Sequence, residues 1–240
     1  MKQPHDNWGA FYDFVYEQTF GIFYSNLTIK TLNAINHILP KGTILDFGAG
    51  TGRLSFPLTE QGYNVTAVEK SIGMVNDFKR KLDEQNSEIE IYSCSISEYE
   101  NGKADLAIAL FTVLSYSITD DELSKNIENI CKHINQNGCF FFDLPNTVFF
   151  TAGRLIDINT PSIRRLVELT RNDNDVDTYR EECSGIFNGQ EFSYKDEFKI
   201  RYWRIGTLDK LLYENGFCDT LKTFSQFNST GSTYKLYKRQ

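Results

Sequence analysis

The sequence lacks several patterns that would assign it to a specialised class of protein. It contains no apolar run of the roughly 18 residues that a membrane-spanning helix needs. Cysteine is scarce, with 5 in 240 residues and no C-x-x-C pair, which argues against a disulfide or zinc framework and predicts reduced, packed thiols. Acidic residues outnumber basic ones, and the formal net charge of −7 opposes binding to nucleic acid or to an anionic membrane.

Two further shortages bear on location and chemistry. The N-terminal stretch has no apolar signal core, so we expect a cytoplasmic protein. The chain has only 3 histidines, His5, His37 and His133, and none clearly follows a predicted strand, where a ligand-facing base would stand in an α/β protein. With so few histidines and cysteines we expect no metal site. The length of 240 residues predicts one domain with a substantial core.

What the chain does have is a dense glycine loop. An apolar pair leads into an acid, and three glycines follow at alternate positions: Ile44, Leu45, Asp46, Gly48, Gly50 and Gly52. This order predicts a buried strand, a tight turn and then a helix. Glycine has no Cβ, so such a turn lets the backbone approach a bound ligand closely.

Two common nucleotide-binding loops fit this stretch poorly. The dinucleotide fingerprint is G-x-G-x-x-G, and Arg53 stands where its third glycine belongs. A P-loop needs Lys followed by Ser or Thr after its glycines, and this chain lacks them. Asp46, two residues before the first glycine, would repel a phosphate but suits a cationic ligand. The remaining alternative is a strand-to-helix turn that binds nothing.

The stretch D-F-G-A-G-T-G (residues 46–52) resembles motif I of the class I S-adenosylmethionine-dependent methyltransferases. The resemblance covers residues 8–150 and 203–240. It implies an α/β fold with a doubly wound, seven-stranded and mostly parallel sheet of the Rossmann-like kind. It also implies S-adenosyl-L-methionine as the cofactor, with S-adenosyl-L-homocysteine as its product. The residues of this loop that the resemblance places at the cofactor are Asp46, Gly48, Ala49, Gly50 and Arg53.

Segments before and after this loop add further cofactor residues by the same resemblance: Tyr12, Glu69, Lys70, Met74, Ser95, Ile96 and Phe111. Glu69 ends the second predicted strand, 19 residues after Gly50, where an acid can bind a ribose diol; a solvated carboxylate is the alternative. Met74 packs either on the adenine or in the core. In the family an Asp after the third strand accepts a hydrogen bond from the adenine amine. Here Ser95 takes that place, and Ile96 keeps the neighbouring apolar contact.

Tyrosines supply the predicted reaction residues. The segment Phe11–Tyr16 resembles the F/Y-Y-D-x-x-Y stretch that opens many small-molecule methyltransferases, although core packing is the alternative for its aromatic side chains. Ligands of open α/β sheets bind beyond the carboxyl ends of the strands, so the segment Phe111–Tyr116 should face the transferred methyl group. We predict Tyr12 and Tyr116 as catalytic residues. The predicted acceptor contacts are Tyr16, Tyr116, Arg154 and Trp203.

Between residues 147 and 205 alternating runs predict antiparallel strands, and Asn188-Gly189 is a hairpin signal. Asn172–Asp177 lacks the glycine and glutamate of a calcium loop, so a polar turn is favoured. The predicted domains are a methyltransferase core with an N-terminal helical cap at 1–150, an inserted antiparallel β subdomain at 151–202, and a return to the core sheet at 203–240. The insertion either covers the site or pairs two subunits in a homodimer.

Local signals predict several element boundaries. Two pairs have the spacing of a capping box, Ser97 with Glu100 and Thr119 with Glu122. The helix that follows Thr119 is expected to run to Ile134 and to stop at Asn137-Gly138, where the fifth strand begins. A later helix is expected to have Thr207 as its cap.

The acceptor is predicted to be a small molecule. Enzymes that methylate amino groups of DNA, RNA or protein amides carry D/N-P-P-Y after the fourth strand, and this chain does not; Asp143–Asn146 follows the next strand and is not counted. A neutral amine needs no general base, whereas a hydroxyl usually does, so the shortage of histidine slightly favours an amine. The alternatives are an O-methyltransferase, a non-catalytic cofactor-binding scaffold, and a nicotinamide-dependent oxidoreductase, which the missing third glycine disfavours.

Overall fold

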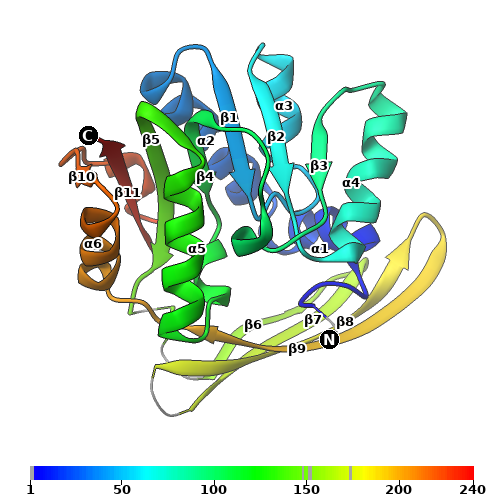
Figure 1. Cartoon of the computed structure of the whole chain (residues 1–240). Helices are drawn as coiled ribbons and strands as arrows, with labels where there is room; N and C mark the ends of the chain where they lie inside the picture. Colours follow the sequence, from blue (N-terminus) through cyan, green and yellow to red (C-terminus); the bar gives the residue numbers. More distant parts are fainter. Residues whose placement is uncertain (1–2, 148, 151–152, 173–174) are drawn as a thin grey trace.

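A computed structural model describes residues 3–147, 149–150, 153–172 and 175–240, and only the backbone of Arg154. The described residues form two sheets (Figure 1). Sheet A has the strand order β10-β11-β5-β4-β1-β2-β3. Its strands are β1 (Thr43–Phe47), β2 (Asn64–Val68), β3 (Glu90–Tyr92), β4 (Ala104–Ala109), β5 (Ile134–Pro145), β10 (Phe217–Asp219) and β11 (Ser232–Arg239). The expected seven-stranded, mostly parallel sheet is confirmed.

The centre of sheet A is β1, which pairs in parallel with β2 on one side and β4 on the other. Such a strand is covered on both faces, and its side chains Ile44, Leu45 and Phe47 are all buried. Strand β11 runs antiparallel to both β5 and β10, as expected for a closing hairpin. The glycine loop therefore leaves the sheet at its middle, where neighbouring strands end on both sides.

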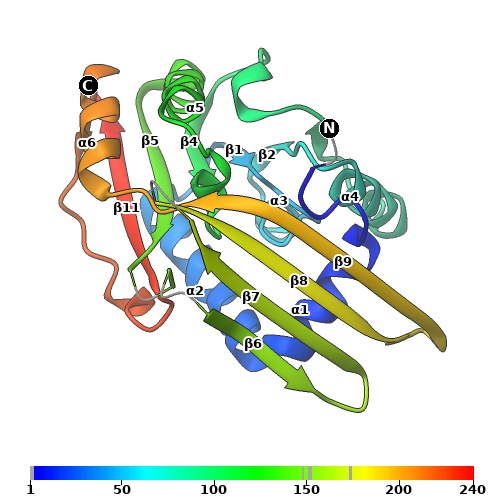
Figure 2. The same ribbon diagram turned by 90° about the horizontal axis from the view of Figure 1, so that it is seen from below.

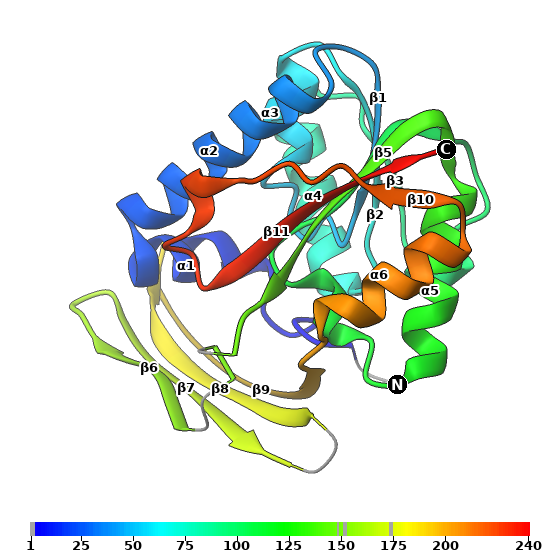
Figure 3. The same ribbon diagram turned by 90° about the vertical axis from the view of Figure 1, so that its left-hand side faces the viewer.

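Helices cover both faces of sheet A (Figure 3). These helices are α2 (Ile22–Ile38), α3 (Ser55–Glu60), α4 (Ile72–Gln85), α5 (Asp120–Lys132) and α6 (Ile205–Glu214). The remaining described helix is α1 (Tyr12–Phe20), and the short 3-10 turns are η1 (Gly9–Phe11), η2 (Ile96–Glu98), η3 (Val113–Tyr116) and η4 (Ser225–Phe227). Side chains of α2, α3 and α4, such as Leu32, Leu58 and Phe78, fill one core. Those of α5 and α6, such as Leu123 and Leu208, fill the core on the other face.

Sheet B lies across the carboxyl ends of the parallel strands, and α1 packs against it (Figures 1 and 2). Its antiparallel strands are β6 (Gly153–Asn159), β7 (Ile163–Arg171), β8 (Val176–Phe187) and β9 (Gln190–Arg201). Three of these were expected, whereas β6, an edge strand that pairs only with β7, was not. The predicted hairpin turn is confirmed, because Asn188 and Gly189 have φ of 51° and 77° between β8 and β9.

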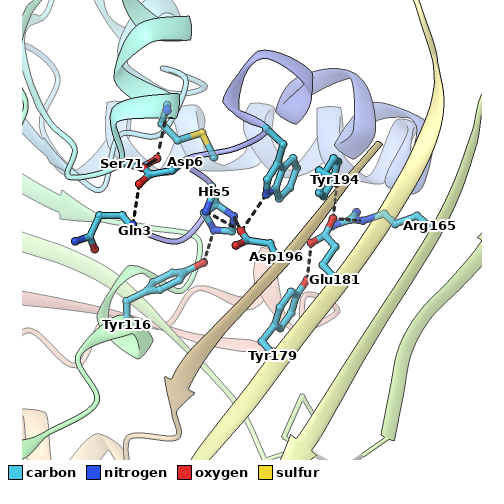
Figure 4. A network of polar contacts seen from close by, with 12 residues as sticks. Gln3, His5, Asp6, Ser71, Tyr116, Arg165, Tyr179, Glu181, Tyr194 and Asp196 are labelled. Carbon is cyan, nitrogen blue, oxygen red and sulfur yellow. Dashed lines mark hydrogen bonds and ion pairs between the residues drawn. The ribbon is translucent and has the colours of Figure 1, made fainter. Parts of the chain in front are cut away.

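A buried ion pair fastens sheet B to α1. Arg165 of β7 donates from Nε to Glu181 of β8 at 2.8 Å, and both side chains are fully buried. Arg165 also donates to Thr19 of α1 at 2.9 Å, and its guanidinium lies 4.7 Å from the ring centre of Tyr16. Figure 4 shows Glu181 receiving the Arg165 bond together with the hydroxyl of Tyr194. Because burial makes unpaired charge expensive, the two sheet-B strands and α1 depend on this contact.

One expected boundary is wrong. Helix α5 ends at Lys132, and Ile134, which was expected to be helical, already begins β5. Asn137 and Gly138 lie inside β5, where the pairing with β4 shifts register beyond Ala104. Asn137 has a φ of 64°, so this turn-like pair makes a bulge in the strand and does not end the helix.

Two expected caps are also wrong. The first capping box uses Ser95 and Glu98, because the Glu98 carboxylate accepts from the Ser95 backbone N–H at 3.0 Å; the expected pair was two residues later, Ser97 with Glu100. Thr207 does not cap α6, which begins at Ile205 after Arg204. The box formed by Thr119 and Glu122 is confirmed by reciprocal bonds of 3.1 Å.

Within the described ranges, no helix is long and apolar enough to cross a membrane. In the same ranges no three His, Cys, Asp or Glu side chains converge as metal ligands. The segment that superficially resembles a calcium loop, Asn172–Asp177, connects β7 to β8, and its residues 173 and 174 lie outside the described residues. The 5 cysteines are free thiols, as expected.

Candidate active site

Two cavities meet at the carboxyl end of sheet A. The first, of about 180 Å³, is lined by the glycine loop and is named the loop cavity. The second, of about 300 Å³, lies between sheet A and sheet B, is lined mainly by aromatic and aliphatic side chains, and is named the aromatic cavity. The residues that line both are His5, Tyr16, Tyr24, Phe111, Thr112 and Tyr116. The two cavities therefore adjoin along these six residues.

The glycine loop opens toward the loop cavity at one position. Gly48 and Gly52 are packed against protein, since a Cβ at either would lie 2.5 Å from Val113 or 2.4 Å from Phe56. Gly50 has a φ of 58°, and a Cβ there would meet nothing within 4 Å. The backbone around Gly50 is therefore left bare toward the cavity it lines, which is what close approach of a ligand requires.

Two carboxylates stand at the glycine loop. Asp46 is buried at the end of β1 and accepts a hydrogen bond from Ser55 at 2.6 Å. Burial raises the pKa of Asp46 to about 6. Glu69, at the end of β2, accepts from the backbone N–H groups of Gly50 at 2.9 Å and Ser71 at 2.8 Å. These backbone bonds hold the half-buried Glu69 beside the glycine loop, which favours the ribose-binding prediction over a carboxylate without partners.

The other end of the loop cavity is mainly apolar. Met74 and Ile96 line it, and Met74 is 3% exposed. Ser95 lines it as well, although its hydroxyl donates to Glu98 at 2.6 Å and so can still accept a bond from a ligand. The ammonium of Lys70 lies 5.7 Å from the ring centre of Tyr116, and burial lowers the pKa of Lys70. A flat group with an amine edge fits this end.

An acid that was not predicted shapes the junction. Phe111 and Thr112 follow β4 with φ of 74° and 68°, a conformation that is costly for residues other than glycine. Their N–H groups donate to Asp143 of the neighbouring strand β5 at 2.6 and 3.1 Å. Burial raises the pKa of this carboxyl group, which also lines the aromatic cavity. The sequence signal that could have identified Asp143 is its position near the carboxyl end of a predicted strand.

Helix α1 brings the predicted tyrosines to the junction. The rings of Tyr12 and Tyr16 stack with centroids 4.3 Å apart, and both line the loop cavity. Asp13, between them, accepts from the Thr51 hydroxyl at 2.7 Å, which ties α1 to the glycine loop. Burial raises the pKa of Tyr12 well above its ordinary value, so this phenol stays protonated. Arg53 stacks over nearby rings, with its guanidinium 5.2 Å from the centre of Phe111.

The segment before α1 crosses the loop cavity and carries a histidine that sequence reasoning placed away from the site. Pro4 and His5 line the loop cavity, and Asp6 accepts from Ser71 at 2.9 Å. Gly73 of α4 lies so close beneath that a Cβ there would be 2.3 Å from the Asp6 carbonyl oxygen. His5 follows no strand, as the sequence indicated, and it reaches the site from the N-terminal segment. No local pattern marks it, because it follows no strand.

All the site residues predicted from the sequence line the loop cavity, with two exceptions, Arg154 and Trp203. Those lining the loop cavity are Tyr12, Tyr16, Asp46, Gly48, Ala49, Gly50, Arg53, Glu69, Lys70, Met74, Ser95, Ile96, Phe111 and Tyr116. Arg154 lies in β6, and its side chain is outside the described residues. The prediction that Trp203 contacts the acceptor is wrong. Its side chain packs in the core with Leu208, and its indole N–H donates to the Ser117 carbonyl at 2.9 Å.

Replacing Trp203 tests this correction. In Trp203→Phe the Ser117 carbonyl loses its buried partner, so the free energy of unfolding should fall by about 1–3 kcal/mol. Because Trp203 lines neither cavity, cofactor affinity should stay within about twofold of wild type, a change of under 1 kcal/mol. Urea unfolding and calorimetric binding check the two halves. A large loss of affinity at unchanged stability would restore Trp203 to the site.

Comparisons with known proteins agree with this geometry. Residues 44–138 match the methyltransferase domain family. The ubiquinone biosynthesis O-methyltransferase of Rickettsia akari is 31% identical over 103 residues, which cover 43% of this chain and 40% of that protein. The chain thus spans about two fifths of the length of these curated relatives; for a putative methyltransferase of Geobacillus the share is 42%.

Solved structures extend the likeness to nearly the whole chain. A S-adenosylmethionine-dependent methyltransferase from Clostridium acetobutylicum superposes with a TM-score of 0.81 at 18% identity, covering 95% of this chain and 97% of that one. The sugar N-methyltransferase KedS8 from Streptoalloteichus gives 0.76 at 16% identity, with 95% and 92% covered. At these identities the likeness establishes the fold. Residues 44–138 are thus a methyltransferase domain, within a chain that has the fold of the class I S-adenosylmethionine-dependent methyltransferases.

Proposed function

We propose that the protein transfers a methyl group from S-adenosylmethionine to a small molecule held in the aromatic cavity. The observation that carries the proposal is the meeting of the two cavities at six shared residues. A loop cavity alone would suit a binding protein. A second cavity that adjoins it, between the two sheets, supplies a place for an acceptor beside the cofactor.

The residues of the loop cavity fit this cofactor. The bare backbone at Gly50 would receive its amino acid and ribose portion, and Glu69 would accept from the ribose hydroxyls. The carboxylate of Asp46 suits the ammonium group. Met74 and Ile96 would sandwich the adenine, with Ser95 at its amine edge. The cofactor supplies an electrophilic methyl group on a sulfonium.

The chain's own contribution to the reaction is alignment in a dry site. An in-line displacement needs the attacking atom and the methyl carbon held close and water kept out. Tyr16, Phe111 and Tyr116 belong to the wall where the cavities meet, and the N–H bond to Asp143 holds Phe111 in its strained conformation. Sheet B closes the aromatic cavity, which supports a covering role for residues 151–202. Pairing of two subunits through this sheet remains the other prediction.

The lining of the aromatic cavity limits the acceptor. Among the described residues it contains aromatic and aliphatic side chains, no lysine or arginine, and a single carboxyl group, that of Asp143. Such a lining favours a small molecule with an apolar or planar body and disfavours an anion. The similar proteins include an O-methyltransferase of ubiquinone biosynthesis and a sugar N-methyltransferase, so oxygen and nitrogen acceptors are both open.

Isothermal titration with S-adenosylmethionine, S-adenosylhomocysteine and NADH in parallel tests the cofactor. Micromolar binding of the first two, lost on changing Asp46 or Glu69, supports the proposal. Binding of NADH instead would turn the assignment to an oxidoreductase. Absence of binding by all three would remove the methyltransferase proposal. Binding without turnover of any acceptor would favour a scaffold.

The affinity for S-adenosylmethionine should depend on pH through Asp46. Burial raises the pKa of this carboxyl group to about 6, so it is ionised above that pH and neutral below it. A neutral carboxyl cannot pair with the cofactor's ammonium group, so affinity should be greatest near pH 7, where both groups are charged, and should fall as pH drops below 6. The limit is about tenfold per pH unit. Titration calorimetry from pH 5 to 8 measures it.

Asp46→Asn is the matched variant for this pH dependence. It should bind about tenfold or more weakly at pH 8, since a charge-assisted bond contributes about 1.5–3 kcal/mol, and it should lose the step near pH 6. Linkage gives the opposite sign for stability. Because the pKa is raised in the folded state, the ionised carboxylate destabilises the protein above pH 6, and this penalty fades as pH falls toward 4. A step that persists in Asp46→Asn would contradict the assignment.

A further inference from the structure

His5 lies between a carboxylate and a phenol, on opposite sides of its ring (Figure 4). Its Nε2 is 2.9 Å from the hydroxyl oxygen of Tyr116, and its Nδ1 is 3.4 Å from a carboxylate oxygen of Asp196. Asp196 belongs to β9 of sheet B and is 5% exposed. A carboxylate that faces one ring nitrogen favours the proton on that nitrogen. The contact of Nδ1 with Asp196 has ion-pair distance but not hydrogen-bond geometry; with the hydrogen on Nδ1, the lone pair of Nε2 would accept from the Tyr116 hydroxyl.

The backbone is strained to build this contact. His5 has a φ of 69°, a left-handed conformation that is unfavourable for a residue with a side chain. Its own N–H donates to Asp196 at 2.7 Å, and the Trp8 indole donates to the same oxygen at 3.0 Å. The ring is held by edge contacts to Trp8 and Phe198, with centroids 5.2 and 5.1 Å away. Such overdetermined strain is typical of functional sites.

The relay ends where the two cavities meet. Both His5 and Tyr116 line the loop cavity and the aromatic cavity. We propose that Asp196, His5 and Tyr116 form a relay that receives a proton from the methyl acceptor, and that the acceptor is therefore a hydroxyl compound. A neutral amine attacks without first losing a proton, so it would leave this relay without a role. The inference rests on the proposed function and adds the class of acceptor to it.

The proposed step balances without another reactant. The acceptor oxygen forms a bond to the methyl carbon as the carbon–sulfur bond breaks, and that electron pair stays on sulfur. The hydroxyl proton of the acceptor passes to the Tyr116 oxygen while the Tyr116 proton passes to Nε2 of His5. The resulting imidazolium is stabilised by the Asp196 carboxylate and later gives its proton to water. His5 and Asp196 thus act through Tyr116 and are positioning residues in this scheme.

The charged and titratable groups around His5 suit this direction of transfer. Burial raises the pKa of Tyr116 well above its ordinary value, which disfavours a standing phenolate and favours passing the proton on. Burial alone would raise the pKa of Asp196, but hydrogen bonds from His5 and Trp8 hold this pKa below its ordinary value. The Asp196 carboxylate therefore stays ionised. From α1, Tyr12 faces His5 with ring centroids 5.8 Å apart. Beyond β2, Lys70 faces the ring of Tyr116.

Nitrogen NMR of the free protein tests the relay without cofactor or acceptor. The sequence has 3 histidines, so a histidine-labelled sample gives few signals, and His5→Gln assigns those of His5. At a pH where the ring is neutral, wild-type His5 should be the Nδ1–H tautomer, the reverse of the form that predominates for histidine in water. Tyr116→Phe should keep this tautomer, and Asp196→Asn should shift it toward Nε2–H. A wild-type Nε2–H tautomer would overturn the relay.

Turnover tests the class of acceptor. With the best substrate from a panel of phenols, alcohols and amines, His5→Gln should lower kcat roughly 100-fold and remove the fall in kcat at low pH that protonation of the base causes. Because His5 also lines the loop cavity, the affinity of the variant for S-adenosylmethionine is measured in parallel, and kcat is compared at saturating cofactor. A panel in which amines alone react, or a hydroxyl acceptor that His5→Gln methylates at the wild-type rate, would overturn the proposal.

The failures of the two proposals can be told apart. If S-adenosylmethionine does not bind while the Nδ1–H tautomer is observed, methyl transfer is removed as the function, and the catalytic role of the relay is removed with it. If the cofactor binds and is turned over but His5 shows the other tautomer, the relay alone falls.

Discussion

Gly50→Ala should weaken binding of S-adenosylmethionine by roughly 10- to 100-fold, because forcing one methyl group into a close contact costs about 1–3 kcal/mol. The new Cβ meets no protein atom within 4 Å, so it projects into free space beside the loop cavity that Gly50 lines. The protein should still fold. The φ of 58° predicts a loss of about 1–2 kcal/mol in the free energy of unfolding, from backbone strain alone. Calorimetry and urea unfolding measure the two effects.

Gly62→Ala is the matched control for this strain. Gly62 also has a positive φ, 89°, and open space where its Cβ would be, but it lies away from both cavities. It should lose similar stability and keep wild-type affinity. Gly48→Ala differs again, because its Cβ would lie 2.5 Å from Val113 and should reduce both quantities. Wild-type affinity in Gly50→Ala would show that the cofactor does not rest on this backbone.

Arg165→Met should lower the free energy of unfolding by about 3–5 kcal/mol, because it leaves the Glu181 carboxylate buried without its cation. Glu181 would keep only neutral partners, the hydroxyls of Tyr194 at 2.6 Å and Tyr179 at 3.3 Å. The change also removes the bond to Thr19, so α1 should loosen from sheet B. Urea unfolding measures the loss, and hydrogen exchange in α1 locates it.

The double variant Arg165→Met/Glu181→Leu separates charge from packing. It removes both charges together and should recover most of the lost free energy of unfolding. Part of the loss should remain, because the hydroxyls of Tyr179 and Tyr194 lose their acceptor. Arg180→Met is the control on the neighbouring strand, since its pair with Glu197 is half exposed and is worth under about 1 kcal/mol. A double variant no more stable than Arg165→Met would show that the ion pair is not what holds the two strands.

The cofactor half of the site was predictable because its signals are local. Asp46, Gly50 and Glu69 lie on two adjacent strands and the loop between them, and spacing along the chain is enough to bring them together. The order of apolar runs likewise predicted sheet A, since strands buried on both faces leave a continuous pattern. These features depend only on the order of strands and loops within the parallel sheet.

The residues that were missed depend on contacts between distant segments. His5 meets Asp196 across 191 positions, and no local pattern records such a pairing. Asp143 faces Phe111 only because β5 lies next to β4 in the sheet. Trp203 was misplaced for a related reason. It follows the insertion closely in sequence, yet its side chain turns into the core under α6. The edge strand β6 has one partner and so a weaker pattern.

The wall of the aromatic cavity is drawn from both ends of the chain, from His5 to Tyr234, whereas the methyltransferase domain match ends at residue 138. The loop cavity draws its lining from residues 4–126 alone, whereas the aromatic cavity is complete only when β11 is in place, because Ser232 and Tyr234 line it. The same division lets descendants of this protein exchange one acceptor for another by changing residues 151–202 and 230–234, with the donor machinery inherited intact.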